Sequence, residues 1–309
     1  MKKDLVSLAD LSREEIQALL DRAATLKAEL RSGAPSRPLV GRTLAMIFEK
    51  PSLRTRVTFE TGIKQLGGAS IYLAPEDIRL GARETVGDIA RNLSRWVDLI
   101  MARTFSHEAL AELAGEASVP VINGLTDLVH PCQILADCQT LLEHRGTLDG
   151  LKLAFIGDGN NVVNSWLNLV ARYEIDFRLG CPAGYEPDPA IVAAVRSATP
   201  GRIEITNDAN AAVDGVDAVY TDVWTSMGQE AESQARRAAF ADYQVNRRLM
   251  NAAKADALIM HCLPAHRGEE ISADVLDGPN AVVFDQAENR LHAQKAVMCW
   301  LDESRERDR

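Results

Sequence analysis

The chain has 309 residues, enough for the hydrophobic cores of about two domains. Hydrophobic residues make up 46% and charged residues 25%, which is the composition of an ordinary soluble globular protein. The formal net charge of −10 argues against a nucleic-acid-binding surface, where a basic stripe is expected. A local cluster of arginines could still bind a small anion.

The cysteines are odd in number and scattered, and no two of them form a C-x-x-C pair: Cys132, Cys138, Cys181, Cys262 and Cys299. Such a set does not predict a disulfide framework, and it favours a reducing, cytoplasmic location. The first residues carry two lysines without an apolar segment behind them, so no signal peptide is expected. No apolar run approaches the roughly 18 residues of a membrane span, so no membrane contact is expected.

The first predicted elements lead to one polar motif. A helix is predicted over 11–30, because Ser12 and Glu15 have capping-box spacing. An apolar run at 44–48 predicts a buried strand, after which Ser52 occupies the N-cap position of a second helix.

The start of this second helix could form a phosphate site. The first backbone N–H groups of a helix lack partners, and the helix dipole favours an anion there. The hydroxyl groups of Ser52 and Thr55 and the guanidinium of Arg54 converge on the same point. The alternative is an ordinary capped helix with solvated arginines, which is the commoner meaning of such a motif taken alone.

The rest of the chain alternates strands and helices in two sets, separated near 145–150. In the first set we predict strands at 69–73, 97–102 and 119–122 and helices at 85–96, 107–117 and 133–142. In the second set we predict strands at 151–158, 176–181, 203–206, 218–223, 257–260 and 281–284. The alternation predicts an α/β fold with two doubly wound parallel-sheet domains and an active-site cleft between them. We place the domains at 1–147 and 148–289, with a last helix near 290–303 folding back onto the first.

Ligands of open α/β sheets lie beyond the carboxyl ends of the strands. At these ends the sequence offers arginines, one histidine, amides and an acid: Ser52, Arg54, Thr55, Arg103, His130, Gln133, Asn161, Asp222 and Arg290. This set suits a doubly anionic phosphate and a polar acyl group, because Arg and His can stabilise charge that develops on a carbonyl oxygen.

Other interpretations of the same residues are weaker. The string Gly157-Asp-Gly-Asn-Asn161 suggests dinucleotide binding, but Val162 replaces the third glycine and no acid ends the next strand, so NAD is not expected. His130 could merely cap a turn, and Cys262 could be a buried apolar thiol. The spacing of His261, Cys262 and His266 matches no zinc pattern, so no metal is expected. Two further histidines are expected to be solvated: His107 and His144.

Five strings, taken together and in order, resemble the aspartate/ornithine carbamoyltransferase family, and the ornithine carbamoyltransferases in particular. They cover the chain from end to end: Phe-Glu-Lys-Pro-Ser-Leu-Arg-Thr-Arg (48–56), His-Pro-Cys-Gln (130–133), Asp-Val-Trp-Thr-Ser-Met-Gly-Gln-Glu (222–230), His-Cys-Leu-Pro-Ala-His-Arg-Gly (261–268) and Glu-Asn-Arg-Leu-His-Ala-Gln-Lys-Ala (288–296). The resemblance implies a homotrimer without a cofactor that moves a carbamoyl group from carbamoyl phosphate to the side-chain amine of L-ornithine. The products are L-citrulline and phosphate, as in arginine biosynthesis.

The resemblance also implies roles for individual residues. Binding of carbamoyl phosphate is implied for Ser52, Leu53, Arg54, Thr55, Arg79, Arg103, His130, Gln133, Cys262, Leu263 and Arg290. A catalytic role is implied for Thr55, Arg103, His130 and Cys262, and ornithine binding for Asn161, Asp222, Ser226 and Met227.

Two positions depart from the family pattern. Leu53 replaces the usual threonine, and Arg79 replaces a frequent glutamine in a loop that the family contributes from a neighbouring subunit. The rivals are an aspartate carbamoyltransferase, an enzyme for acylated ornithine, a non-catalytic phosphate-binding module and a nucleotide-dependent oxidoreductase. The first would need basic groups for a second carboxylate, where this chain has Asp222. A carboxylate placed for a free α-ammonium disfavours the second, and the intact arginines and His130 disfavour the third.

Overall fold

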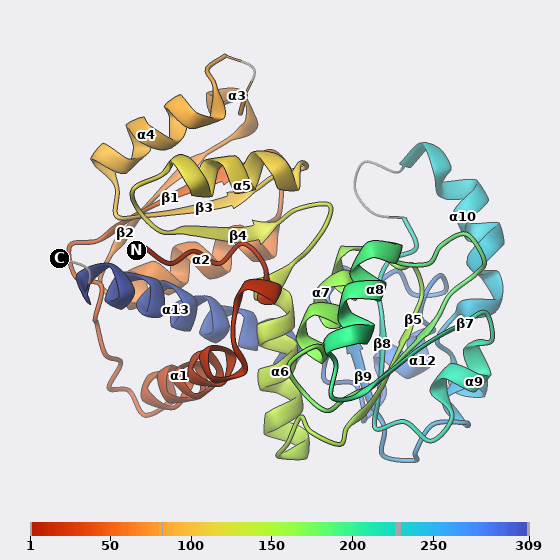
Figure 1. Cartoon of the computed structure of the whole chain (residues 1–309). Coiled ribbons are helices and arrows are strands. Elements are labelled where there is room, and N and C mark those ends of the chain that lie inside the picture. The colour runs from red at the N-terminus through yellow and green to blue at the C-terminus, as the bar shows by residue number, and fades with distance from the viewer. Residues whose placement is uncertain (1, 79, 82, 226–229, 308–309) are drawn as a thin grey trace. The chain divides into compact units, whose positions relative to one another are not determined.

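A computed structural model describes residues 2–78, 80–81, 83–225 and 230–307 of the chain. The chain forms two compact units: unit 1 is Met1–Gln139 with Glu288–Arg309, and unit 2 is Thr140–Ala287. Each unit contains its own parallel sheet with flanking helices (Figure 1), which confirms the predicted α/β class. The domain limits predicted from the sequence stay a prediction.

Unit 1 is built on a sheet of order β2-β1-β3-β4, and all of its strand pairs are parallel. Its strands are β1 (Thr43–Phe48), β2 (Ala69–Leu73), β3 (Leu99–Arg103) and β4 (Val121–Leu125). Its helices are η1 (Leu8–Asp10), α1 (Arg13–Arg31), α2 (Leu53–Gln65), α3 (Pro75–Ile78), α4 (Val86–Trp96) and α5 (His107–Glu116), followed by the start of α6 (Pro131–Arg145) and most of α13 (Val283–Arg307).

The two faces of this sheet are covered by different helices (Figure 1). On one face, alternate strand residues such as Ala45, Ile47 and Ile100 pack against Ile89 of α4 and Leu110 of α5. Helix α2 lies on the other face and packs closely on α13, because Gly62 leaves room there for side chains of α13. Strands β1 and β3 are buried along nearly their whole length, as expected for a parallel sheet between two helical layers.

Unit 2 has a sheet of order β7-β6-β5-β8-β9, which is doubly wound. Its strands are β5 (Lys152–Ile156), β6 (Asp176–Gly180), β7 (Arg202–Thr206), β8 (Ala218–Thr221) and β9 (Leu258–His261). Its helices are α7 (Asn161–Val170), α8 (Pro189–Ala198), α9 (Ala209–Val213), η2 (Glu230–Glu232), α10 (Ser233–Phe240), η3 (Ala241–Tyr243), α11 (Arg247–Met250) and α12 (Ala273–Leu276).

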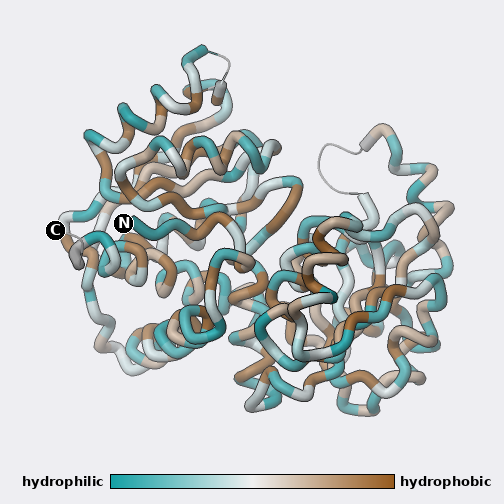
Figure 2. Tube along the Cα trace, in the orientation of Figure 1, coloured by the Kyte–Doolittle hydropathy of each residue, from teal (hydrophilic) through white to brown (hydrophobic). Residues whose placement is uncertain are grey.

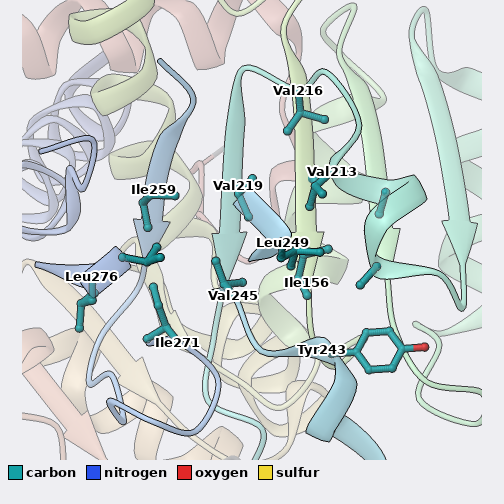
Figure 3. Close-up of a cluster of buried hydrophobic side chains, with 14 of the residues drawn as sticks. Ile156, Val213, Val216, Val219, Tyr243, Val245, Leu249, Ile259, Ile271 and Leu276 are labelled. Atoms are coloured by element: carbon teal, nitrogen blue, oxygen red, sulfur yellow. The ribbon is translucent and has the colours of Figure 1, made fainter. Parts of the chain in front are cut away.

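A hydrophobic core cluster of unit 2 lies on one face of the neighbouring strands β5, β8 and β9. Figure 3 shows Ile156, Val219 and Ile259, from β5, β8 and β9, with Val213 and Leu249 from the covering helices. Full burial of one such side chain contributes roughly 1.5–3 kcal/mol to the folding free energy. On the opposite face of the sheet, four aromatic side chains pack against one another: Phe155, Trp166, Phe177 and Tyr220. In Figure 2 hydrophobic residues run along the strands of both units, whereas α1 is mostly hydrophilic.

Two predicted elements differ from the structure. The segment 281–284 is not a strand, because Ala281 makes only an isolated bridge to Ile259 and α13 begins at Val283. Strand β4 continues to Leu125 instead of leaving the sheet at Asn123. Gly124 permits this course, since a Cβ atom there would lie 2.5 Å from the sulfur of Met101. Among the described residues, none of the helices is both long and apolar enough to cross a membrane.

Candidate functional site

In both sheets, some of the candidate residues, such as Ser52, Arg103 and Asp222, follow the strands between which the strand order reverses. In unit 1 these strands are β1 and β3, and in unit 2 they are β5 and β8. Crevices of open α/β sheets form at such switch points, outside the carboxyl ends of the strands. The position of these residues is therefore the one that ligand-binding groups take in this fold class.

In unit 1, helix α2 begins at the predicted N-cap. Ser52 has an extended backbone, and its Oγ accepts a hydrogen bond from the N–H of Thr55 at 3.3 Å. The Ser52 hydroxyl also lies 3.1 Å from Oγ1 of Thr55. Leu53, in the first turn, is 76% exposed. The helix thus starts with a polar cluster and with backbone N–H groups that suit an anion.

Two buried guanidinium groups belong to the same unit. Arg103 is the last residue of β3 and is 5% exposed, and Arg290 on α13 is 4% exposed. Arg290 Nη2 donates a hydrogen bond to Thr55 Oγ1 at 3.0 Å, so α13 contacts the start of α2. A carboxylate or phosphate that approaches this helix start therefore meets a positive field in spite of the net negative charge of the chain.

His130 is buried at the entry to α6 and is neutral at neutral pH. Burial lowers the pKa of His130 well below its ordinary value, and the positive charges of Arg290 and Arg103 lower this pKa further. A neutral imidazole next to two guanidinium groups can donate a hydrogen bond to a carbonyl oxygen without adding a third positive charge.

Gln133 provides an amide one helical turn beyond His130. It is 1% exposed, and its Nε2 donates to Asp137 Oδ1 at 2.8 Å. Because a carboxylate can only accept, this bond fixes the orientation of the amide. Gln133 Oε1 is buried, and no described residue donates to it. The oxygen is thus an available acceptor for an N–H group of a ligand.

In unit 2, Asp222 follows β8 and lies at the centre of a hydrogen-bonded group. Its Oδ2 accepts from Asn160 Nδ2 at 3.0 Å, and its Oδ1 accepts from the Cys262 thiol at 2.9 Å and the Val223 N–H at 2.8 Å. The residue is 7% exposed. The carboxylate is therefore held in one orientation by three donors.

Asn160 is a residue that sequence reasoning missed. Its Oδ1 caps α7 by accepting from the N–H groups of Val162 and Val163, and its Nδ2 reaches Asp222. The prediction placed ligand binding on the neighbouring Asn161, the first residue of α7. The close turn before the cap depends on Gly159, because a Cβ atom there would lie 2.3 Å from the backbone N of Pro187.

A buried His–Glu pair supports the segment after β9. His261 and Glu270 are each 0% exposed, and His261 Nε2 lies 3.0 Å from Glu270 Oε1. His261 Nδ1 accepts from the N–H of Leu263 at 2.9 Å, so the proton lies on Nε2 and is donated to the glutamate. Leu263 has a φ of 59°, a strained backbone that this bond helps to hold. Sequence reasoning stopped at Gly268 and missed Glu270.

The ligand atoms of Asp222, His261 and Cys262 lie within 4.8 Å of one another, close enough to bind one metal ion. Both ring nitrogens of His261 are engaged, however, with Glu270 and with the N–H of Leu263. A metal bound here would have to break one of these bonds. The prediction of no metal stays a prediction.

Several other predicted residues have clear placements. His107 was predicted to be solvated, but it is half-buried, and its Nδ1 lies 3.0 Å from Thr126 Oγ1. Burial lowers the pKa of His107. His144 is exposed and lies 3.0 Å from Asp285. Three predicted ligand-binding residues fall outside the described part of the chain: Arg79, Ser226 and Met227.

Comparison with known proteins finds two family models, which together match most of the chain. The family model for the carbamoyl-P binding domain of aspartate/ornithine carbamoyltransferase matches residues 3–143, and the model for the Asp/Orn binding domain matches residues 149–301. The ornithine carbamoyltransferase of Syntrophus aciditrophicus is 52% identical over 299 residues, covering 96% of this chain and 99% of that protein. That of Thermococcus kodakarensis is 53% identical over 302 residues, covering 97% of this chain and 96% of that protein.

Solved structures agree with the sequence relatives. The ornithine carbamoyltransferase from Pyrococcus furiosus superposes with a TM-score of 0.93 at 50% identity, covering 96% of each chain. The anabolic ornithine carbamoyltransferase from Campylobacter jejuni gives a TM-score of 0.92 at 38% identity, covering 97% of this chain and 99% of that one. The sequence motifs, the two parallel sheets and these matches agree, and the chain belongs to the aspartate/ornithine carbamoyltransferase family.

Proposed function

We propose that the protein transfers the carbamoyl group of carbamoyl phosphate to the side-chain amine of L-ornithine, giving L-citrulline and phosphate. The observation that carries this proposal is the division of polar groups between the units. Unit 1 presents a helix start whose N–H groups and dipole suit an anion, with Arg103, Arg290 and neutral His130, and unit 2 presents the oriented carboxylate of Asp222. The ornithine carbamoyltransferases described above, at 52% and 53% identity, support ornithine as the acceptor.

The phosphate group binds at the start of α2. The backbone N–H of Leu53 remains available there, although this chain lacks the hydroxyl of the usual threonine. The other phosphate ligands are Ser52, Arg54, Thr55, Arg79 and Arg103. Charge-assisted hydrogen bonds from guanidinium groups are the stronger contacts of such a site.

The carbamoyl oxygen accepts hydrogen bonds from Arg103, His130 and Thr55. These donors are worth most when negative charge develops on that oxygen in the tetrahedral transition state. The carbamoyl NH2 group is held by Gln133, whose buried Oε1 is an acceptor, together with Cys262, Leu263 and Arg290. Cys262 is the fourth proposed catalytic residue, beside the three donors to the carbamoyl oxygen.

Ornithine is bound in unit 2. Its α-ammonium pairs with Asp222, and the rest of its backbone is held by Asn161, Ser226 and Met227. An acyl group on the α-nitrogen would remove this positive charge and leave Asp222 without its partner. An aspartate acceptor would require basic groups for its second carboxylate, and Asp222 would repel it.

The chemistry requires a neutral amine. From an ordinary pKa near ~10.4, deprotonating the side-chain ammonium of ornithine at pH 7 costs about 4–5 kcal/mol. The amine then attacks the carbamoyl carbon, the tetrahedral oxyanion collapses, and the C–O bond to phosphate breaks. The departing phosphate takes the proton released by the amine, so the protein's main tasks are orientation and stabilisation of the oxyanion.

An acceptor comparison tests the proposal. The protein is incubated with carbamoyl phosphate and, separately, ornithine, aspartate or acetylornithine, and phosphate release is measured. We expect release well above the no-acceptor background with ornithine alone. Release that depends on aspartate or acetylornithine instead would refute the acceptor assignment, and no stimulation by any acceptor would refute the transferase function.

We also propose a cytoplasmic homotrimer with shared sites. All five cysteines, each within the described ranges, are free thiols, which suits a reducing compartment. In a cyclic trimer each head-to-tail interface can bring Arg79 of one subunit to the phosphate site of the next. Arg54→Ala and Arg79→Ala proteins, denatured together and reassembled, should regain activity above either parent. A fully active Arg79 variant, or confirmed hybrids without rescue, would refute this sharing.

A further inference from the structure

Three loops of unit 1 carry the groups that surround the proposed carbamoyl phosphate site. The loop after β1 leads to Ser52, the loop after β3 begins directly beyond Arg103, and the loop after β4 leads to His130. Backbone hydrogen bonds link them: Glu49 N–H donates to Arg103 O at 2.9 Å, and Asp127 N–H donates to Phe105 O at 3.0 Å. Backbone hydrogen bonds therefore connect the three loops with one another at the carboxyl ends of the strands.

The side chain of Lys50 lies where these loops meet. It is 4% exposed, although lysine is among the residues least often buried without a partner. Its ammonium forms an ion pair with Asp127, in the loop after β4, and lies 4.1 Å from the ring centroid of Phe105, in the loop after β3. Glu49 strengthens the same junction by accepting the N–H of Phe105 at 3.0 Å.

One ammonium group thus contacts a side chain from each of the other two loops. The ammonium of Lys50 is buried although the Asp127 side chain is exposed, so removing the carboxylate leaves a buried charge without its ion-pair partner, which is costly. The cation–π contact with Phe105 adds to the same restraint. Loops joined in this way cannot shift independently, so the distances between the groups that they carry are fixed.

We propose that Lys50 is a positioning residue for carbamoyl phosphate binding, acting through Asp127 and Phe105 to hold the phosphate-binding helix start at a fixed separation from Arg103 and His130. This inference rests on the proposed function of these three groups. Lys50 does not itself bind the phosphate, because its charge is compensated by Asp127. Misplacement of binding groups by even about 1 Å can cost two orders of magnitude in rate.

The direction in which Asp127→Asn changes the affinity for carbamoyl phosphate distinguishes the possible roles of Lys50. Replacing Asp127 by Asn removes a negative charge near an anion site, which by electrostatics alone would favour carbamoyl phosphate. If Lys50 were itself a phosphate ligand, releasing its ammonium from the ion pair would also favour binding. A positioning role predicts the opposite, because the loops lose their link.

The experiment measures the carbamoyl phosphate Kd by calorimetry for wild type, Lys50→Met, Asp127→Asn and the double variant. We expect each single change to raise the Kd at least tenfold, and the double variant to be no worse than the poorer single one. The ornithine KM, measured at saturating carbamoyl phosphate, should stay within twofold of wild type. The matched controls alter an exposed ion pair of the same unit, Arg91→Met and Glu116→Gln, and should leave the Kd unchanged.

Each outcome decides the question. The side chain of Asp127 is 62% exposed, so Asp127→Asn gives a folded test even if Lys50→Met does not fold. An unchanged or lower Kd in folded Asp127→Asn overturns the inference, and so does a loss of stability without a change in Kd. If wild type itself fails to bind carbamoyl phosphate, the proposed function falls and the inference with it. If wild type binds and Arg54→Ala does not, failure at Asp127 concerns the inference alone.

Discussion

Replacing Asp222 by Asn tests the ornithine site directly, because the structure defines what the carboxylate accepts. One oxygen takes the Asn160 amide, and the other takes the Cys262 thiol and the Val223 N–H. An asparagine can present only one oxygen, so in either orientation its NH2 group faces a donor. One mispaired buried group costs about 1–3 kcal/mol of folding free energy.

Asp222→Asn is expected to weaken ornithine binding by more than it reduces stability, and to do so without affecting the other substrate. Loss of a charge-assisted partner for the α-ammonium costs about 1.5–3 kcal/mol, which corresponds to a rise of about 10- to 150-fold in the ornithine KM. Carbamoyl phosphate binding should remain close to wild type, since its proposed anion-binding groups, such as Arg54 and Arg103, belong to unit 1. Asp274→Asn is the control, because Asp274 is an exposed carboxylate of unit 2 that pairs with Arg247 at 3.1 Å.

The assay combines steady-state kinetics in ornithine with calorimetry of carbamoyl phosphate alone and with denaturant unfolding. The unfolding curve identifies conditions under which the Asp222→Asn protein is fully folded. Equal loss of affinity for both ligands under those conditions would show that Asp222 is a structural residue. An unchanged ornithine KM would refute its pairing with the α-ammonium.

Three further outcomes are expected. Arg54→Ala should weaken carbamoyl phosphate binding at least tenfold with unchanged unfolding free energy, and an unchanged Kd would refute the phosphate site. Burial, with nearby lysines, lowers the pKa of His292 to about 4, so the folded state binds this proton less readily than the unfolded chain. Relative to His292→Gln, wild type should therefore lose about 3 kcal/mol of unfolding free energy between pH 6.5 and pH 4 and none above it; parallel curves would contradict this. Gly159→Ala should destabilise unit 2, since its Cβ would clash with the backbone of Pro187, and an unchanged unfolding midpoint would contradict the close approach.

Local signals predict most of the fold correctly. The capping residues Ser12 and Ser52 begin helices where the sequence places them, because the cap satisfies backbone groups within a few residues. The strand predicted at 281–284 is wrong, because a short apolar run fits a strand and a buried helix equally well. The single bridge from Ala281 to Ile259 is the one strand-like contact that the structure describes for this run.

The groups that sequence reasoning missed are defined by contacts across the fold. Glu270 follows an acidic neighbour and looks like a solvated charge, yet it is 0% exposed against His261. Asn160 could be recognised as a cap, but its bond to Asp222 depends on the pairing of β5 with β8. Lys50 lies inside a recognised motif, and its contacts with other loops form only once the sheet is assembled.

The separate cores of the two units have a consequence for how this family can diversify. The cluster around Ile156 and Val219 lies wholly within unit 2, and the cluster around Ile47 and Ile100 lies wholly within unit 1. Changes after β8 can therefore be selected for a different amine without repacking unit 1, whereas Cys262 and Leu263 after β9 are proposed to hold the carbamoyl group. An acceptor-switching library should accordingly be confined to the segment after β8, with the sequence of unit 1 and the segment after β9 left unchanged.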